Sequence, residues 1–154
     1  AAATLLPLAA SVSRMILGGA SDRFGRIHVM AASFVLAGIF RFGLVGAGTA
    51  GAPIAFVAMV VGSMFFSSPL YVYFPSVVAD YYGAEHSSGN YAVLYTAKVG
   101  GGVFAGTVVG VLVAAFGWVP TVAFGGALAL AAGLAALVLR PPSGAVPDGA
   151  GPNA

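Results

Sequence analysis

The feature that most restricts how this chain can fold is a series of long apolar stretches separated by short polar or glycine-containing connections. A helix needs about 20 mostly apolar residues to cross a hydrocarbon core about 30 Å thick. Five segments meet that length, and they lie at about residues 1–20, 27–46, 54–79, 91–116 and 119–139. The sequence therefore predicts an all-α integral membrane protein with five transmembrane helices, the third of them kinked at Pro69 and Pro75.

The composition supports a membrane protein and excludes several other classes. Only 6% of the 154 residues are charged, whereas ordinary soluble domains carry about 25%. The six basic residues that give the net charge of +2 are scattered and form no basic patch, so no nucleic-acid partner is expected. There is no cysteine, and the two histidines lie in different loops without metal-ligand spacing. No acid pair, triad or phosphate loop is present, and the sequence predicts neither a cofactor, nor a metal site, nor an enzyme.

The two ends of the chain and its loops suggest how it sits in the membrane. Residues 140–154, rich in proline and glycine, are predicted to form a disordered tail. The first residues lack a basic region and an initiator methionine, which argues against a signal peptide and for a chain entered partway through a larger protein. Arg23 and Arg26 share one loop, and Arg140 follows an even number of crossings later. By the positive-inside rule these loops are cytoplasmic. The expected location is that of an integral, multi-pass protein of a bacterial inner (plasma) membrane.

Two cations fall inside the predicted helices. Arg14 lies eight residues before Asp22, and Lys98 lies eight residues after Asn90. At 1.5 Å rise per residue each is about 12 Å from the cytoplasmic end, near the midplane. A charge there costs at least about 2.5–3.5 kcal/mol and often marks a ligand site.

The charge that balances these cations is not found in the same segments, because all four acidic residues fall in loops or the tail. Either another part of the protein supplies a carboxylate or the balancing charge is an anionic substrate, and the shared depth favours the substrate. A guanidinium and an ammonium together suit a small carboxylate dianion. Arg41 sits toward the outer end of its helix and receives no substrate role.

Aromatic and glycine residues near Lys98 complete the candidate set. Tyr95 lies one turn before Lys98, and Tyr71 lies about 13 Å deep; both can wall the site, or simply pack as interfacial tyrosines. A loose dinucleotide-type pattern at residues 100–105 lies inside an apolar helix and lacks the preceding strand. It is better interpreted as a stripe of small residues for close approach of another helix, formed by Gly102, Gly106 and Gly110.

The loop after the first helix resembles a motif of the major facilitator superfamily. The segment GGASDRFGR matches the pattern G-x-x-x-D-R-x-G-R through Gly18, Asp22, Arg23, Gly25 and Arg26. In that superfamily the motif recurs on the cytoplasmic side after helices 2 and 8, where it acts in gating. The resemblance implies that the chain covers helices 8 to 12, a partial C-terminal bundle whose partner is a missing N-terminal half.

Within the superfamily, the chain resembles the oxalate/formate antiporter family. The similarity lies in the arginine ahead of the motif and in the segment NYAVLYTAK, residues 90–98. It implies that Arg14 and Lys98 bind substrate carboxylates and that Tyr71 and Tyr95 belong to an aromatic box. Ser67 stands where the oxalate carrier has a bulky aromatic residue, a departure that leaves the identity of the carboxylate open.

The expected function is secondary active transport of small carboxylates, as oxalate/formate-type anion exchange by alternating access. Two alternatives remain open at this point. One is a transporter of another monocarboxylate or organic anion, and the other is a non-transporting receptor or assembly subunit that uses the glycine stripe as its contact surface. The sequence does not distinguish exchange from proton symport.

Overall fold

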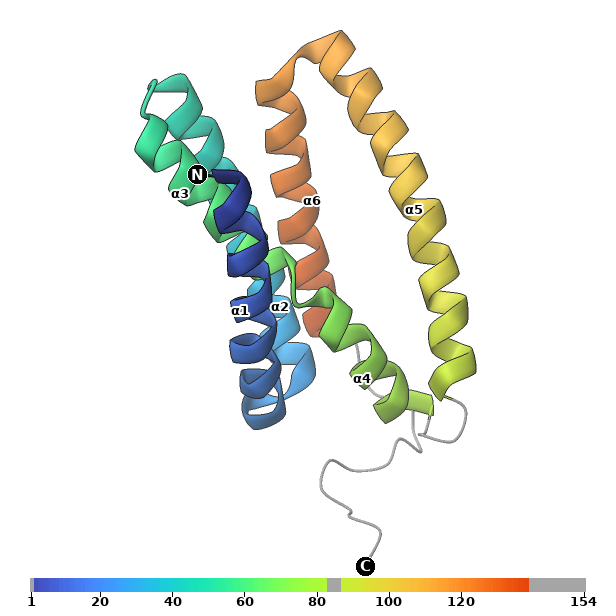
Figure 1. Ribbon diagram of the computed structural model, residues 1–154. Coiled ribbons are helices and arrows are strands. Elements are labelled where there is room, and N and C mark those ends of the chain that lie inside the picture. The colour runs from blue at the N-terminus through green and yellow to red at the C-terminus, as the bar shows by residue number, and fades with distance from the viewer. Residues whose placement is uncertain (1, 83–86, 139–154) are drawn as a thin grey trace, which may run out of the picture.

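The computed structural model describes six helices and no strand within residues 2–82 and 87–138 (Figure 1). The helices are α1 (Ala2–Phe24), α2 (Arg26–Thr49), α3 (Pro53–Ser67), α4 (Leu70–Tyr82), α5 (Ser87–Phe116) and α6 (Trp118–Val138). Inside these ranges, a few side chains are outside the description, namely those of residues 2, 3, 71, 80–82, 87, 88, 94 and 97. The predicted all-α class is confirmed. The predicted tail, residues 140–154, lies outside the described residues.

Four stretches of the described helices are long and apolar enough to cross a membrane. They are Arg26–Thr49, Pro53–Ala79, Gly89–Phe116 and Trp118–Val138. Helix α1, the fifth predicted span, has 23 residues, enough for about 34 Å at 1.5 Å per residue. It is the least apolar of the six helices and carries Arg14, Asp22 and Arg23, and it is not among the four stretches.

Glycines with a left-handed backbone make the tight connections between neighbouring helices. Gly25 (φ 86°) alone separates α1 from α2, Gly51 (φ 66°) lies between α2 and α3, and Gly117 (φ 82°) alone separates α5 from α6. A side chain is strained in this region of φ, and glycine is not. These short connections reverse the chain direction between consecutive helices.

The segment predicted as one kinked helix, residues 54–79, forms two helices that are separated at Ser68 and Pro69. Pro69 has no N–H to continue the ladder of α3, and its ring clashes with the carbonyl one turn back. Its own carbonyl accepts the N–H groups of Val72 and Tyr73 at 2.8 and 3.0 Å, which starts α4. Pro75 lies inside α4. The break therefore comes from the first proline.

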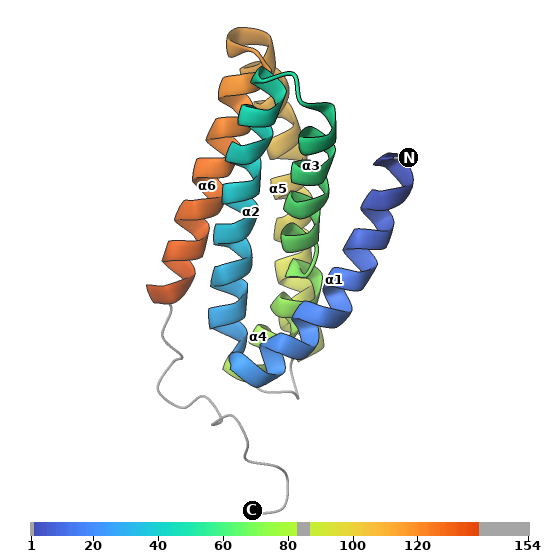
Figure 2. The same cartoon turned by 90° about the vertical axis from the view of Figure 1, so that its left-hand side faces the viewer.

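Helix α2 is the centre of the bundle and packs along α6 on one side and α3 on the other (Figure 2). Glycines allow the close approach of α2 and α6. A Cβ atom placed on Gly133 would lie 2.9 Å from the carbonyl oxygen of Ala31, and one on Gly38 would lie 2.8 Å from Cγ of Leu130. Small residues at such crossings let two backbones meet.

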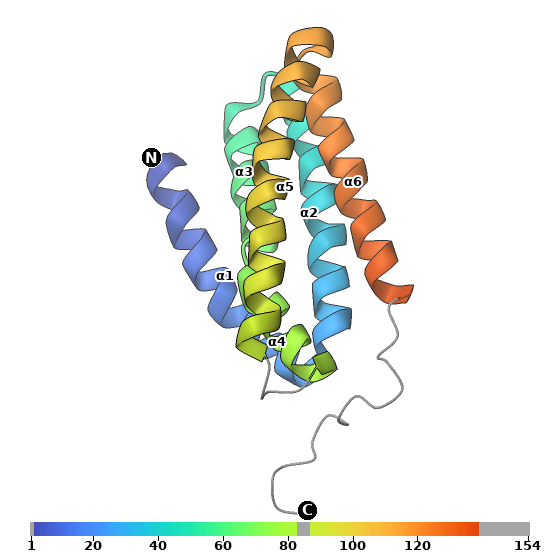
Figure 3. The same ribbon diagram turned by 90° about the vertical axis from the view of Figure 1, so that its right-hand side faces the viewer.

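Helix α5 stands at the edge of the bundle in Figure 1 and lies nearest the viewer in Figure 3. It contacts α4 and α6, and no residue in its most apolar stretch is buried within the described part of the chain. A Cβ atom on Gly102, Gly106 or Gly110 would meet nothing within 4 Å. The predicted packing role of this stripe therefore has no counterpart among the described helices and stays a prediction.

A cluster of buried, mainly apolar side chains lies where α2, α4 and α6 meet. Tyr73 of α4 is fully buried, and its hydroxyl lies 3.1 Å from Oγ of Ser33 on α2. Met30, Ala31 and Ala136 complete this cluster. Because the tyrosine hydroxyl has a partner, its burial leaves no unsatisfied polar group at that atom. The cluster holds α4 against α2, below the break at Pro69.

Candidate functional site

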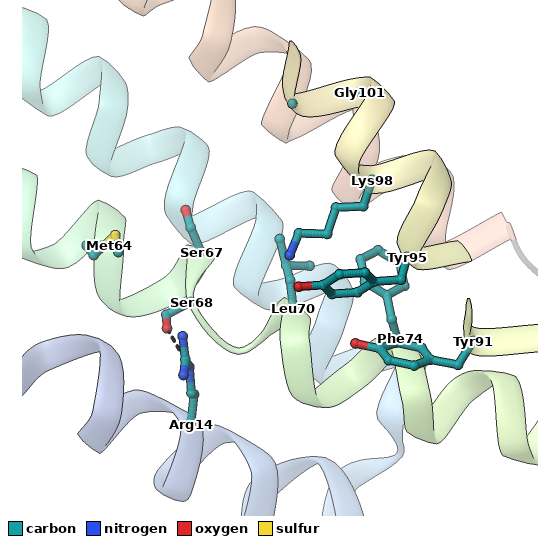
Figure 4. A pocket seen from close by; sticks show the side chains of 11 residues that line it. Arg14, Met64, Ser67, Ser68, Leu70, Phe74, Tyr91, Tyr95, Lys98 and Gly101 are labelled. Atoms are coloured by element: carbon teal, nitrogen blue, oxygen red, sulfur yellow. Dashed lines mark hydrogen bonds between the residues drawn. The ribbon is translucent and has the colours of Figure 1, made fainter. Parts of the chain in front are cut away.

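A cavity of about 750 Å³ lies between α1, α3, α4 and α5 (Figure 4). Its polar lining comes from Arg14, Ser67, Ser68, Tyr91, Tyr95 and Lys98. Met64, Leu70 and Phe74 are apolar side chains of its wall, and Gly101 and Gly102 of α5 complete the lining. The two cations that the sequence predicts at one depth thus line one cavity, although they stand on helices far apart in the chain.

Arg14 reaches the cavity from α1 and is held by the α3–α4 break. Its Nε donates a hydrogen bond of 3.0 Å to Oγ of Ser68, and that hydroxyl donates at 3.2 Å to the carbonyl oxygen of Ala10 (Figure 4). Ser68 is 3% exposed, whereas Arg14 is exposed, so the serine anchors a guanidinium that solvent and ligands can reach. Since a guanidinium has five N–H donors, Arg14 can hold a carboxylate bidentately while Nε stays on Ser68.

Lys98 enters the cavity from α5 together with two tyrosines of the same helix face. Its Nζ lies 4.7 Å from the centroid of the Tyr95 ring, within the range of a cation–π contact. The rings of Tyr91 and Tyr95 are 5.8 Å apart between centroids and tilted by 52°. In Figure 4 the ring of Tyr95 lies next to the ammonium group, and the ring of Tyr91 lies beyond it.

Arg41 lies behind this cavity and joins three helices. Its Nη1 donates to the carbonyl oxygen of Gly125 on α6 at 3.2 Å, and its Nη2 donates to Oγ of Ser67 at the end of α3 at 3.4 Å. Its side chain is half-buried. The sequence places Arg41 toward the outer end of its helix without a role at the site, whereas in the structure it contacts a residue that lines the cavity.

The loop motif ties the α1–α2 corner to α4. Arg26 Nη1 donates at 3.1 Å to the carbonyl oxygen of Ser76, and its Nε lies 3.6 Å from Oδ1 of Asp22. A Cβ atom on Gly18 would lie 3.5 Å from Val72. Arg23 is exposed. The Asp22–Arg26 pair is solvent-accessible and contributes little stability by itself, so the contact to α4 is the structural link at this corner.

Some site residues were predicted and others were not. Tyr95, Arg14 and Lys98 line the cavity as the sequence suggests, whereas the side chain of Tyr71 lies outside the described residues, and its role stays a prediction. Sequence reasoning missed Tyr91 and Ser68. Tyr91 was recognisable, since it is one turn before Tyr95 on the same helix face. Ser68 was not, because its contact to Arg14 spans 54 residues of sequence.

The fold and the cavity together define a class of protein. Apolar helices of membrane-spanning length surround a cavity that has cationic side chains from two helices, and no acidic side chain lines it among the residues described. Such cations inside a membrane bundle mark substrate or ion pathways. This is the architecture of a multi-pass membrane transporter.

Comparison with known families agrees with this class. The family model of the Major Facilitator Superfamily matches residues 1–153, and the chain belongs to this superfamily. The superfamily consists of membrane transporters and is not a class of enzymes, and the resemblance carried by residues 18–26 is confirmed at this level. The search of curated proteins and the search of solved structures returned no match. The narrower resemblance to oxalate/formate antiporters stays a prediction.

Proposed function

We propose that this protein transports small carboxylate anions by alternating access and that it binds the anion between Arg14 and Lys98. The observation that carries the proposal is the shared cavity, which both side chains line from opposite helices, α1 and α5. In a site of low polarity an arginine and a lysine together can neutralise a dianion such as oxalate. Each carboxylate gains charge-assisted hydrogen bonds, which are about twice as strong as neutral ones.

The break between α3 and α4 supports a transport site at this depth. Non-helical backbone inside a membrane is tolerated where it is buried in protein or lines a water-filled cavity. Ser68 lines the cavity at the break, and interrupted helices often form substrate sites in secondary transporters. The break and the two cations therefore support the same location.

Exchange is the expected mode of transport, of the oxalate/formate type. Arg14 and Lys98 repel each other when no anion lies between them, and an anion removes that repulsion. The loaded carrier then closes and reorients more readily than the empty one. Alternating access needs two halves that move against each other, and we propose an N-terminal half as the partner of this bundle.

The test is counterflow of radiolabelled oxalate and formate in proteoliposomes that contain the protein as its gene encodes it. The Arg14→Gln variant is measured in parallel as the paired control. We expect exchange in the wild type and its loss in the variant, because the bidentate partner of the carboxylate is removed. A folded wild type that exchanges neither anion would contradict carboxylate exchange of this type. In that case, other monocarboxylates and organic anions would be tested next. A carboxylate-dependent rise in melting temperature without flux would favour the non-transporting receptor.

The hydroxyl of Ser68 is expected to tune anion affinity through Arg14. In Ser68→Ala, Nε of Arg14 loses its acceptor, and hydrogen bonds to charged groups contribute about 1.5–3 kcal/mol. We expect the affinity for oxalate, measured by equilibrium binding, to fall by about tenfold. The matched control is Ser11→Ala on the exposed side of α1, where the hydroxyl bonds only to the carbonyl of Pro7. Equal effects of the two variants would contradict the role of Ser68.

A further inference from the structure

The two serines at the end of α3 have neighbouring positions but different hydrogen bonds. Ser68 accepts from Arg14 and donates to the carbonyl oxygen of Ala10, so its hydroxyl proton is already used. Ser67 accepts from Nη2 of Arg41 at 3.4 Å and makes no other hydrogen bond within the described part of the chain. A serine hydroxyl has one proton to donate besides its lone pairs. The proton of Ser67 is therefore available to a further acceptor.

The position of Ser67 indicates where that acceptor lies. Several hydroxyls of this bundle donate to carbonyl groups one turn back in their own helix, as Ser33 does to Val29 and Ser76 does to Val72. Ser67 does not, and it lines the cavity that contains Arg14 and Lys98 (Figure 4). Its contact to Arg41 is on the side of α2 and α6, because the same guanidinium also binds the carbonyl oxygen of Gly125.

We propose that Ser67 is a third anion-binding group of this cavity and that Arg41 is its positioning residue. Ser67 donates its hydroxyl proton to a carboxylate oxygen of the bound anion. Arg41 donates a hydrogen bond to the serine oxygen from the side of α2 and α6 and so polarises the O–H bond. A hydroxyl that accepts a hydrogen bond from a cation donates a stronger hydrogen bond to its own acceptor. The positive charge of Arg41 also acts on the anion across a medium of low polarity. This inference rests on the proposed function and adds a determinant of specificity to it.

A third donor distinguishes dicarboxylates from monocarboxylates. Formate has two oxygens, which the fork of Arg14 alone can satisfy. Oxalate has four, and after Arg14 and Lys98 have bound it still carries acceptors that must find donors in the cavity. Ser67 supplies one of them. The Ser67–Arg41 pair therefore favours the dicarboxylate.

The experiment measures equilibrium binding of radiolabelled oxalate and formate to the purified protein, as its gene encodes it, in lipid nanodiscs. We expect Ser67→Ala to weaken oxalate binding by about tenfold or more and formate binding by less than about twofold. Ser67→Thr keeps the hydroxyl and should retain most of the oxalate affinity. Ser63→Ala, one turn earlier on α3 and outside the cavity lining, should change neither affinity.

Arg41 is tested by a double-mutant cycle, because its bond to Gly125 also gives it a structural role. If Arg41 acts through Ser67, Arg41→Gln weakens oxalate binding about tenfold in the wild type and much less in the Ser67→Ala background. A merely structural role would lower the melting temperature and the oxalate affinity equally in both backgrounds. That result would overturn the positioning role.

The outcomes separate this inference from the function on which it rests. A wild type that binds oxalate, with Ser67→Ala unchanged or equally weakened for oxalate and formate, overturns only the third binding group. A folded wild type that binds neither anion overturns both proposals. If Ser67→Ala weakens the binding of oxalate but not that of formate, and Ser67→Thr retains most of the oxalate affinity, the result supports both proposals.

Discussion

Replacing Lys98 with glutamine is expected to reduce oxalate exchange by at least about thirtyfold, because the anion loses one of the two full charges that compensate its own. Once the bound anion has displaced water from the site, removing one partner of such a hydrogen-bonded charge pair costs about 2–5 kcal/mol, and each 1.4 kcal/mol corresponds to about tenfold in affinity. The measurement is counterflow of radiolabelled oxalate in proteoliposomes, at several external concentrations.

The same substitution should leave the empty protein about as stable as the wild type. Lys98 and Arg14 line one cavity, and removing one of two like charges relieves their repulsion, which offsets the loss of the contact between Nζ and the Tyr95 ring, worth about 0.5–1 kcal/mol at an exposed position. A melting temperature that is unchanged or higher, together with lost exchange, therefore excludes misfolding as the cause. Undiminished exchange would contradict the role of Lys98 in binding.

A matched control for Lys98→Gln is Thr107→Gln on the same helix. Thr107 lies outside the cavity lining, and its hydroxyl bonds to the carbonyl of Val103 in its own helix. The Thr107→Gln substitution introduces the same glutamine into α5 and leaves both cations of the cavity in place. We expect exchange close to that of the wild type, so a comparable loss would indicate a general effect of polar residues on α5.

The second large effect is expected in the packing of α2 on α6. A Cβ atom at Gly133 would lie 2.8 Å from Cγ2 of Val35, 2.9 Å from the carbonyl oxygen of Ala31 and 3.1 Å from the backbone nitrogen of Val35. Two of these three atoms are backbone, which cannot move away by a side-chain rotation. Gly133→Ala must therefore push the helices apart, and overpacking of this kind costs about 1–3 kcal/mol.

The control for this prediction is Gly46→Ala on α2. Nothing lies within 4 Å of a Cβ atom built at Gly46, and alanine has a higher helix propensity than glycine by about 1 kcal/mol. The two substitutions are chemically identical and both replace a helical glycine, so the difference between the two variants measures the overpacking. We expect a lower melting temperature in detergent for Gly133→Ala than for Gly46→Ala, and equal melting temperatures would contradict the close α2–α6 contact.

The glycines show where sequence reasoning succeeded and where it failed. Spacing along α5 predicts a packing stripe at Gly102, Gly106 and Gly110, but a Cβ atom at any of them meets nothing within the described helices. The close helix contact is instead made by Gly38 and Gly133. Spacing reports which residues share a face of a helix. It does not report which face meets a neighbour, and so it did not identify the α2–α6 contact.

The candidate site divides in the same way. Arg14 and Lys98 were recognisable from the sequence because a charge inside an apolar segment is costly and rare, and counting residues from the helix ends gave their depth. Ser67, Ser68 and Arg41 were not recognised as a connected group. Their bonds join residues 26 to 54 positions apart, and a serine carries no charge that would single it out among the many small residues of this chain.

The sequence by itself determined the environment, the helical class and the superfamily. These follow from hydrophobicity and from a contiguous motif, and both are local properties of the chain. Only the tertiary structure decided that Pro69 divides one predicted span into α3 and α4, and that the break brings Ser67 and Ser68 to Arg41 and Arg14. The reason is physical: the cost of burying a charge can be read from its neighbours in sequence, whereas its hydrogen-bond partners depend on which helix faces pack together.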